Sequence, residues 1–218
     1  MSKRALIVHG GWEGHDPCQT SALFAGLLRE EGFAVDVFDS LDAFWKLKGG
    51  EHSLVVPMWT MGTIDNELVG IISSAVRAGA GLAGFHGGMG DAFRNSTDWQ
   101  FMTGAQFVAH PGDIIPYTVE IANAAHPITR GLGNFRMESE QYYMHFDPAV
   151  RVLATTTFSG EHAPETADVV MPVAYTKPWG GGRVYYCSLG HRMEDLEVPG
   201  CRAMILRGML WAARALPE

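Results

Sequence analysis

The sequence predicts an α/β fold with a mainly parallel central sheet, helices on both faces of it, and antiparallel hairpins added in the second half. Two observations carry this prediction. In the first 90 residues, short apolar runs alternate with amphipathic stretches of helical length, the pattern of parallel strands joined by crossover helices. From residue 117 onwards, apolar segments follow one another closely enough to pair as hairpins.

Four short apolar runs in the first half are predicted to be buried parallel strands, because each is rich in Val, Ile, Leu or Ala and stops at a polar or glycine-rich loop. These runs cover residues 4–10, 33–39, 52–59 and 81–87. Helices are predicted over 18–32 and 65–79. The second helix has Asp65 as its N-cap and Gly79 near its end.

Five further strands are predicted in the second half, and a glycine run at 180–182 marks the turn between the last two. These strands cover residues 117–123, 135–144, 151–158, 172–178 and 182–190. An amphipathic helix is predicted over 201–216. No linker rich in Pro, Gly and Ser interrupts the pattern, so we expect one domain over residues 1–218.

The composition excludes several classes of partner. The net charge of −8 argues against nucleic acid and anionic membranes, which both attract basic surfaces. No stretch approaches the ~20 apolar residues of a membrane span, and the apolar run near the N-terminus is too short for a signal peptide. The three cysteines are too few and too scattered for a disulfide framework or a CxxC zinc site. We therefore expect a cytoplasmic protein.

The segment GLAGFHGGMGDAF, residues 81–93, predicts a strand, a glycine-rich turn and a helix, with His86 at the tip of the turn. In elbows of this shape the tip residue is usually a Ser or Cys nucleophile. Histidine is a poor covalent nucleophile here, because its loop offers no base and no oxyanion donors. Metal ligation or acid–base catalysis is the more plausible role, and glycines on both sides would let a ligand approach closely.

Polar and aromatic residues follow several of the predicted strands, at the edge where open parallel sheets bind ligands. They are His9, Trp12, Glu13, His15, Asp16, Trp59, Thr60, His86, Asp91 and His191. A neutral imidazole can ligate a metal or carry a proton near neutral pH. Alternatively, each histidine caps its strand and hydrogen-bonds to the backbone.

A divalent cation, zinc or manganese, is one reading of the histidines. His15, His86 and His110 are the candidate ligands, and Glu140 and His191 are further candidates. None of them has the spacing of a known zinc motif such as HExxH. The loops also lack the Lys and Ser or Thr positions of a phosphate-binding loop, so a nucleotide site is not expected.

The segment at 137–145 predicts a strand that places Glu138, Glu140 and Tyr142 on one face. Two carboxylates so close could raise each other's pKa and act as an acid or a base, although a solvated strand face would give the same pattern. Aromatic rings could stack on a sugar ring, or they could simply pack in the core. The candidate rings are Trp12, Trp59, Tyr142 and Trp179.

Several segments resemble the trehalose-utilisation (ThuA-like) family, whose fold is related to flavodoxin-like proteins and class I glutamine amidotransferases. They are LIVHGGWEGHDP, GLAGFHGGMGDAF, FVAHPG, HPITRGL, SEQYY and PVAYTKPWGGGRVYYCSLGH, and together they span nearly the whole chain. The resemblance implies a three-layer sandwich in which His86 replaces the catalytic Cys of an amidotransferase, so glutaminase activity should be absent. Residue 139 is Ser where the family often has an acidic residue.

The resemblance also implies sugar or keto-sugar metabolism. We expect a hydrolase or isomerase acting on a disaccharide such as trehalose, or on its keto derivative, with His86, Glu140 and His191 as catalytic residues. Substrate contacts are expected from Trp12, Glu13, His15, Asp91, Tyr142 and Trp179. The alternative is a non-catalytic carbohydrate-binding or sensor module. A homo-oligomer is expected if Trp211 covers an interface rather than packing the last helix onto the sheet.

Overall fold

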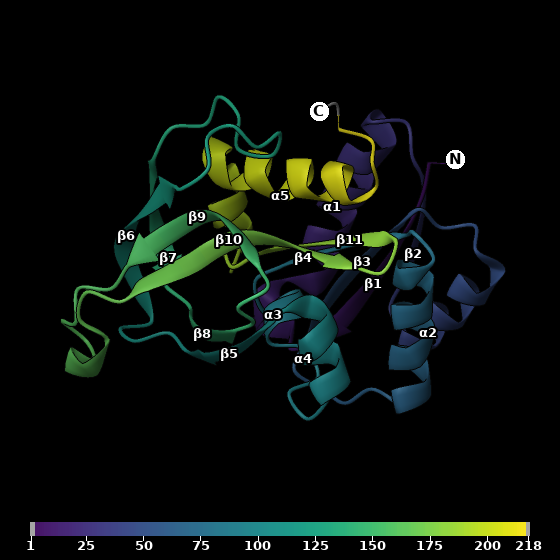
Figure 1. The fold of residues 1–218 in the computed structure, drawn as a ribbon, viewed down its shortest axis with the longest axis horizontal. Helices are drawn as coiled ribbons and strands as arrows, with labels where there is room; N and C mark the ends of the chain where they lie inside the picture. The colour runs from purple at the N-terminus through teal and green to yellow at the C-terminus, as the bar shows by residue number, and fades with distance from the viewer. Residues whose placement is uncertain (1–2, 217–218) are drawn as a thin grey trace.

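The structure, a computed structural model, describes residues 3–216, and a nine-stranded sheet runs through the middle of this part of the chain (Figure 1). The strand order is β2-β1-β3-β4-β11-β10-β9-β6-β7. The strands are β1 (Arg4–Gly11), β2 (Ala34–Phe38), β3 (Leu54–Thr60), β4 (Gly81–Phe85), β6 (Ile114–Ile121), β7 (Phe135–Glu140), β9 (Arg151–Thr157), β10 (Val170–Trp179) and β11 (Gly182–Cys187).

The parallel part of the sheet comprises β2, β1, β3, β4 and β11. The remaining strands pair antiparallel, beginning with the β10–β11 hairpin. Two short strands, β5 (Ala105–Ala109) and β8 (Tyr143–Phe146), form a separate antiparallel pair. The order β2-β1-β3 places a topological switch point between β1 and β3, which is where flavodoxin-like sheets bind their ligands.

Helices cover both faces of the sheet, so the molecule has three layers (Figure 1). α1 (Pro17–Glu30) and α5 (Pro199–Ala212) lie on one face, and α2 (Asn66–Arg77) and α4 (Thr97–Thr103) lie on the other. The 3-10 segment η2 (Leu41–Gly49) packs beside α2. The short elements η1 (Glu13–His15), α3 (Gly87–Gly90), η3 (Pro164–Thr166) and η4 (Met193–Glu197) lie in the connections.

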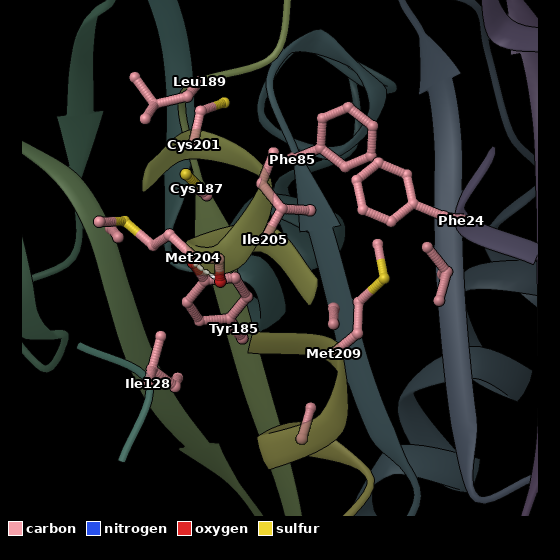
Figure 2. Close-up of a cluster of buried hydrophobic side chains, with 14 of the residues drawn as sticks. Phe24, Phe85, Ile128, Tyr185, Cys187, Leu189, Cys201, Met204, Ile205 and Met209 are labelled. Carbon is pink, nitrogen blue, oxygen red and sulfur yellow. Dashed lines mark hydrogen bonds between the residues drawn. The ribbon is translucent and has the colours of Figure 1, made fainter. Parts of the chain in front are cut away.

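Each face of the sheet has its own apolar core. Under α1 and α5, Phe24 and Met209 pack with Phe85 in the cluster shown in Figure 2. α5 comes very close to the sheet: a Cβ at Gly208 would lie 1.9 Å from the ring of Tyr185, so only glycine fits there. The Tyr185 hydroxyl donates to the Met204 carbonyl at 2.9 Å, which satisfies a polar group buried in this core.

The predicted three-layer α/β fold with a mainly parallel sheet and added antiparallel strands is confirmed, but two segments differ from the prediction. The stretch 107–113, interpreted as loop, begins with the end of β5. The strand predicted over 135–144 is broken after Glu140, because the chain leaves the nine-stranded sheet and continues as β8, paired with β5. Among the described residues, no helix is long and apolar enough to cross a membrane.

Candidate functional site

The turn after β4 holds His86 in a backbone conformation that is costly for a residue with a Cβ, at φ 45° and ψ −143°. Hydrogen bonds fix this turn. The His86 N–H donates to the Cys187 carbonyl at 2.7 Å, and the His86 carbonyl accepts from the Tyr186 hydroxyl at 3.1 Å. A Cβ at Gly87 would lie 2.5 Å from the ring of His15, so the glycine allows the two histidines to come together.

The hydrogen bonds of His86 determine which ring nitrogen carries the proton. Its Nδ1 lies 2.8 Å from the carbonyl oxygen of Ser188, which can only accept, so Nδ1 is the donor. In the neutral ring Nε2 therefore has a free lone pair, which accepts from the Tyr142 hydroxyl at 2.9 Å. The same Nε2 lies 3.1 Å from Oε2 of Glu140. Metal-bound histidines commonly have this arrangement, in which the second nitrogen donates to a carbonyl or a carboxylate.

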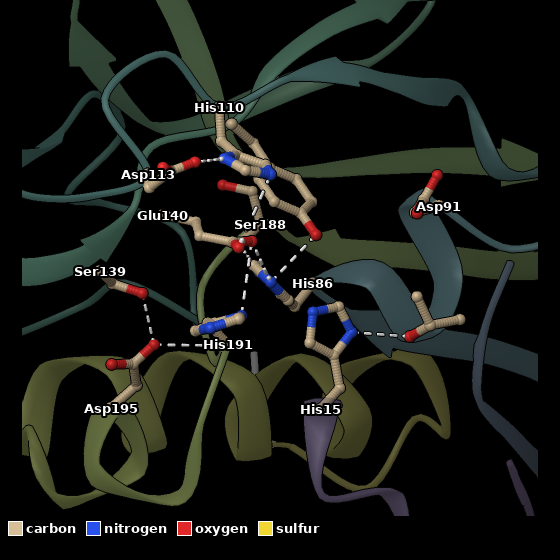
Figure 3. A network of polar contacts seen from close by, with 12 residues as sticks. His15, His86, Asp91, His110, Asp113, Ser139, Glu140, Ser188, His191 and Asp195 are labelled. Atoms are coloured by element: carbon tan, nitrogen blue, oxygen red, sulfur yellow. Dashed lines mark hydrogen bonds and ion pairs between the residues drawn. The ribbon is translucent and has the colours of Figure 1, made fainter. Parts of the chain in front are cut away.

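Three further side chains meet His86 at the carboxyl edge of the sheet (Figure 3). His15 comes from η1 after β1, His191 from the loop after β11, and Glu140 from the end of β7. One ligand atom from each of His15, His86, Glu140 and His191 lies within 4.8 Å of the others. We call these four residues the His/Glu group.

Neighbouring residues hold the group in place. His15 Nδ1 is 2.8 Å from the Thr60 hydroxyl at the end of β3. The His191 N–H donates to Asp195 Oδ2 at 2.8 Å, and the same oxygen accepts from the hydroxyl of buried Ser139. The ring of His191 is therefore positioned through its own backbone, and its side-chain nitrogens remain free to face Glu140.

Glu140 is the negative charge at the centre of the group. Its side chain is about one-tenth exposed, and within residues 3–216 its ion pairs are all with histidines: His86 at 3.1 Å, His191 at 3.4 Å and His110 at 3.7 Å. Burial opposes its ionisation. A hydrogen bond from His86, which forms when its Nε2 carries a proton, and the charges of protonated histidines outweigh burial and lower the pKa of Glu140 to about 2. Within residues 3–216, no lysine or arginine forms an ion pair with this carboxylate.

Two histidines of the group, His15 and His191, have lowered pKa values. Burial lowers the pKa of His15 to about 3, and repulsion from protonated His86 and His191 adds to this effect. Burial, with repulsion from protonated His86, also lowers the pKa of His191. Neutral imidazole and ionised carboxylate are the forms that bind metal ions. At neutral pH His15, His191 and Glu140 are thus ligands that need lose no proton.

Two observations show that the group fits a cation. The Nδ1 atom of His191 is buried without a hydrogen-bond partner. In addition, the His86 lone pair faces a carboxylate oxygen at 3.1 Å, a contact that is favourable only with a proton or a cation between the two atoms. Three imidazoles and one carboxylate are a ligand set typical of zinc and other first-row divalent ions. The His/Glu group could therefore hold a metal ion.

Several other predicted site residues surround the group without belonging to it. Half-buried His110 is outside the four-residue set, although its Nε2 points towards Glu140 Oε1. Tyr142 is buried against His86, with the ring centroids 4.2 Å apart. Exposed Trp12 packs edge-on against His15, and exposed Glu13 lies beside it in η1. Buried Asp91 binds Arg94 through both carboxylate oxygens.

The structure corrects two of the predictions. Trp179 lies at the opposite edge of the sheet, where its Nε1 donates to Ser73 of α2, because β10 runs antiparallel and ends far from the carboxyl edge. The second correction concerns the pair of carboxylates on the 137–145 strand. Glu138 points to solvent and is not one of the groups that shift the pKa of Glu140, and that pKa is lowered rather than raised.

Sequence reasoning did not identify Ser139, Ser188 and Asp195 as residues that position the group, or Arg94 as the partner of Asp91. Thr60 was among the residues expected at the strand ends. The contact between Ser139 and Asp195 joins residues 56 positions apart and has no local motif, although Asp195 also accepts from the N–H of nearby His191.

Comparison with known proteins gives this geometry a family. The ThuA family, described as trehalose utilisation, matches residues 4–212. This chain belongs to the ThuA family. The predicted resemblance is thereby confirmed, and the match includes all four residues of the His/Glu group. No protein with a curated description matches the sequence significantly.

Solved structures confirm the fold class of this ThuA-family chain. A ThuA-like protein from Parabacteroides merdae is 18% identical with a TM-score of 0.80, over 100% of this chain and 92% of the other. One from Bacteroides uniformis is 20% identical with a TM-score of 0.76, over 96% and 90%. The cold-adapted β-galactosidase from Rahnella sp. R3 is 18% identical with a TM-score of 0.63, and the match covers 100% of this chain but 33% of that enzyme.

Proposed function

We propose that this ThuA-family protein is a carbohydrate enzyme that binds a divalent cation at the His/Glu group and acts on a disaccharide such as trehalose or its keto derivative. The observation that supports this proposal is the buried carboxylate of Glu140, which is surrounded by histidines. The pKa of one of them, His15, is lowered to about 3. The family's description as trehalose utilisation supports the class of substrate.

The carboxylates around the site favour isomerisation of a keto-sugar over glycoside hydrolysis. Glycosidases of the usual kind need two carboxyl groups, one on each side of the bond. Here Asp91 is bound by Arg94, and Asp195 accepts from Ser139 and from the His191 backbone. Asp113 pairs with His110 at 3.2 Å, whereas Glu140 faces His86, His191 and His110. Proton transfer beside a carbonyl is the chemistry that fits one carboxylate among several imidazoles.

The residues at the mouth of the site supply binding and proton transfer. A bound divalent cation would polarise a sugar carbonyl or hydroxyl. His86, Glu140 and His191 hold the reacting end of the sugar, and half-buried His110 is placed to carry a proton at Nε2. The Tyr142 hydroxyl, whose pKa is raised well above 10 by burial, remains a hydrogen-bond donor. Trp12, 46% exposed beside His15, offers a ring face to the sugar.

A second candidate function is a carbohydrate-binding or sensor module without turnover. It is favoured by the elbow itself, which holds a histidine where related elbows carry a nucleophile. Under this alternative the same residues bind the sugar, and the strained turn serves only to place His86.

The cellular setting is proposed on similar grounds. Cys187 and Cys201 are buried free thiols, which suits the reducing cytoplasm. Trp211 is half-buried, with its ring 5.4 Å from that of His126 and beneath Arg183. Because Trp211 makes these contacts within its own chain, it is no evidence for an interface, and a homo-oligomer remains a prediction.

The test is turnover of trehalose and of a keto derivative of trehalose, followed by NMR of the products. We expect a change in the keto-sugar, and a loss of at least about 100-fold in kcat/KM in His86→Ala and Glu140→Gln, because each removes a group at the reacting centre. Losses below threefold in both variants, with folding intact, would contradict the proposal. Binding of sugar without turnover in the wild type would favour the module instead.

A further inference from the structure

A polar pocket lies where the sheet opens between β6 and β9. Among the described residues these strands pair only at Glu120–Thr155 and Ile121–Ala154, and they diverge beyond Glu120. The gap forms a pocket of about 210 Å³. Its lining includes Ile115, Tyr117, Gln141, Thr157, Glu161 and His162.

The lining suits a neutral polyhydroxyl compound. No lysine or arginine of the described chain lines the pocket, which disfavours a phosphate or a carboxylate. Diverging strand edges present N–H and C=O groups that lack cross-strand partners, and sugar hydroxyls both donate and accept. The side chains of Ile115 and Tyr117 supply apolar surface for the C–H face of a ring.

A buried amide stands in the pocket with half of its hydrogen-bonding capacity unused. Gln141 is 3% exposed. Its Nε2 donates to the Thr156 hydroxyl at 2.7 Å and to the Thr157 carbonyl at 3.3 Å. Its Oε1 accepts from no residue in the described part of the chain. An acceptor that is held in place by its own amide nitrogen is a ready partner for a ligand hydroxyl.

Two segments of the chain run from the lining of the pocket to the His/Glu group. Gln141 directly follows Glu140 in the sequence. The side chain of Gln141 lines the pocket, and that of Glu140 belongs to the His/Glu group. The turn at residues 110–113 also borders both. His110 faces Glu140 on one side of the turn, and on the other side a Cβ at Gly112 would lie 2.5 Å from the ring of His162.

We infer that this pocket is a subsite for the second sugar ring of a neutral disaccharide whose first ring lies at the His/Glu group. The inference rests on the proposed function. The volume of 210 Å³ corresponds to roughly seven waters at about 30 Å³ each, and it lies below the ~300–1,000 Å³ of sites for drug-sized ligands. It accommodates one sugar ring.

The test compares the affinities of trehalose and glucose, measured by titration calorimetry. Thr118→Trp fills the pocket from an exposed position on β6, and Thr118→Ala at the same position leaves it open. We expect the wild type and Thr118→Ala to bind trehalose at least about tenfold more tightly than glucose. In Thr118→Trp the trehalose affinity falls to that of glucose, and the glucose affinity is unchanged. Gln141→Met weakens trehalose binding severalfold by removing the free acceptor.

A thermal melt checks that each variant is folded. An unchanged ratio of trehalose to glucose affinity in folded Thr118→Trp overturns the subsite, and so does a wild type that binds neither sugar. The His86→Ala variant distinguishes a failure of the subsite from a failure of the proposed function. Loss of glucose binding in that variant supports the proposed function whatever Thr118→Trp does. Unchanged binding of both sugars contradicts the proposed function, and a loss specific to trehalose in Thr118→Trp then still supports a sugar site in the pocket.

Discussion

A histidine–carboxylate pair lies at each of the two edges of the sheet, and the pairs differ in the burial of the carboxylate and in its cationic partner. At the amino edge, His52 Nε2 lies 2.9 Å from Asp36, and Arg4 binds the same carboxylate at 2.8 Å. At the carboxyl edge, His86 lies 3.1 Å from Glu140, whose other ion-pair partners in the described chain are histidines. Both places contain a buried imidazole nitrogen without a partner. Asp36 has a fixed cation beside it in Arg4, whereas Glu140 has none among the described residues.

The presence or absence of a fixed counter-charge distinguishes a structural ion pair from a ligand site. The hydrogen bond from Arg4 and, to a smaller extent, that from His52 lower the pKa of Asp36. The charge of Arg4 then balances the charge of the Asp36 carboxylate. The pKa of Glu140 is also lowered, to about 2, but the groups that lower it are histidines, which carry a charge only when they are protonated. A buried charge without a fixed counter-charge is costly. The carboxyl edge is thus suited to a cation supplied from solution.

Cavity size would lead to the opposite choice. A groove of about 1120 Å³ lies at the amino edge, whereas the void beneath His86 measures about 10 Å³. Four charged residues of the large groove form the ion pairs Arg4–Glu51 and Lys48–Glu67, and Arg214 donates to the Gly181 carbonyl at 2.6 Å. We place the function at the carboxyl edge because ligands of open parallel sheets bind there, and because the unbalanced carboxylate lies there.

The largest expected effect is on catalysis, and it sharpens the comparison directly. His86→Ala and His52→Ala each remove the histidine of one pair. We expect His86→Ala to lower kcat/KM for the keto-sugar by about 100-fold or more, because a positioned acid–base or metal ligand is lost. His52→Ala should lose stability but keep its turnover. Equal losses of turnover in the two variants would remove the distinction between the edges.

Chelation is the next test, and it reads out stability. A cation that binds only the folded state at 100 times its Kd adds about 2.7 kcal/mol, and 1 kcal/mol corresponds to ~2–4 °C in a chain of this length. EDTA should therefore lower the Tm of the wild type by roughly 5–10 °C. It should leave Glu140→Gln unchanged, because that variant lacks the charged ligand. A chelator effect of equal size in both proteins contradicts the assignment.

The pH dependence of the metal-free protein gives a smaller effect. The pKa of His15 falls from 6.5 to about 3 on folding, so between those values the unfolded chain binds the additional proton. Stability therefore falls as the pH drops through this window. From pH 7 to pH 5 we expect wild type to lose up to about 2 kcal/mol more than His15→Asn. Urea titrations at the two pH values measure this, and parallel losses would show that His15 is not held neutral.

The smallest effect is expected at the amino edge. Arg4→Met removes the exposed partner of Asp36, and we expect a small destabilisation of the size found for surface ion pairs. The direction of the pH dependence follows from Asp36, whose pKa is lowered from 3.8 in the folded protein. The contribution of Arg4 is present above that value and disappears as the pH falls through the lowered pKa. Turnover and cation binding should not change, and a loss of either would show that the edges are coupled.

The sequence located the histidines better than it located their partners. His15, His86 and His191 could be placed because each follows a strand of the parallel part, and parallel strands bring such residues to one edge. Trp179 was misplaced because it ends an antiparallel strand, whose direction depends on a pairing that the sequence does not reveal. Glu140 was found, but its surroundings depend on the break between β7 and β8. That break turns Tyr142 towards His86, while Glu138 faces solvent.

The most direct test of the central claim is metal content, measured by elemental mass spectrometry on protein purified without a histidine tag. Wild type, Glu140→Gln and His52→Ala are prepared side by side. We predict close to one divalent ion per chain in wild type and in His52→Ala, and none in Glu140→Gln. Wild-type protein that contains no divalent ion, and takes up none from added zinc or manganese, would contradict the claim that the His/Glu group is a cation site.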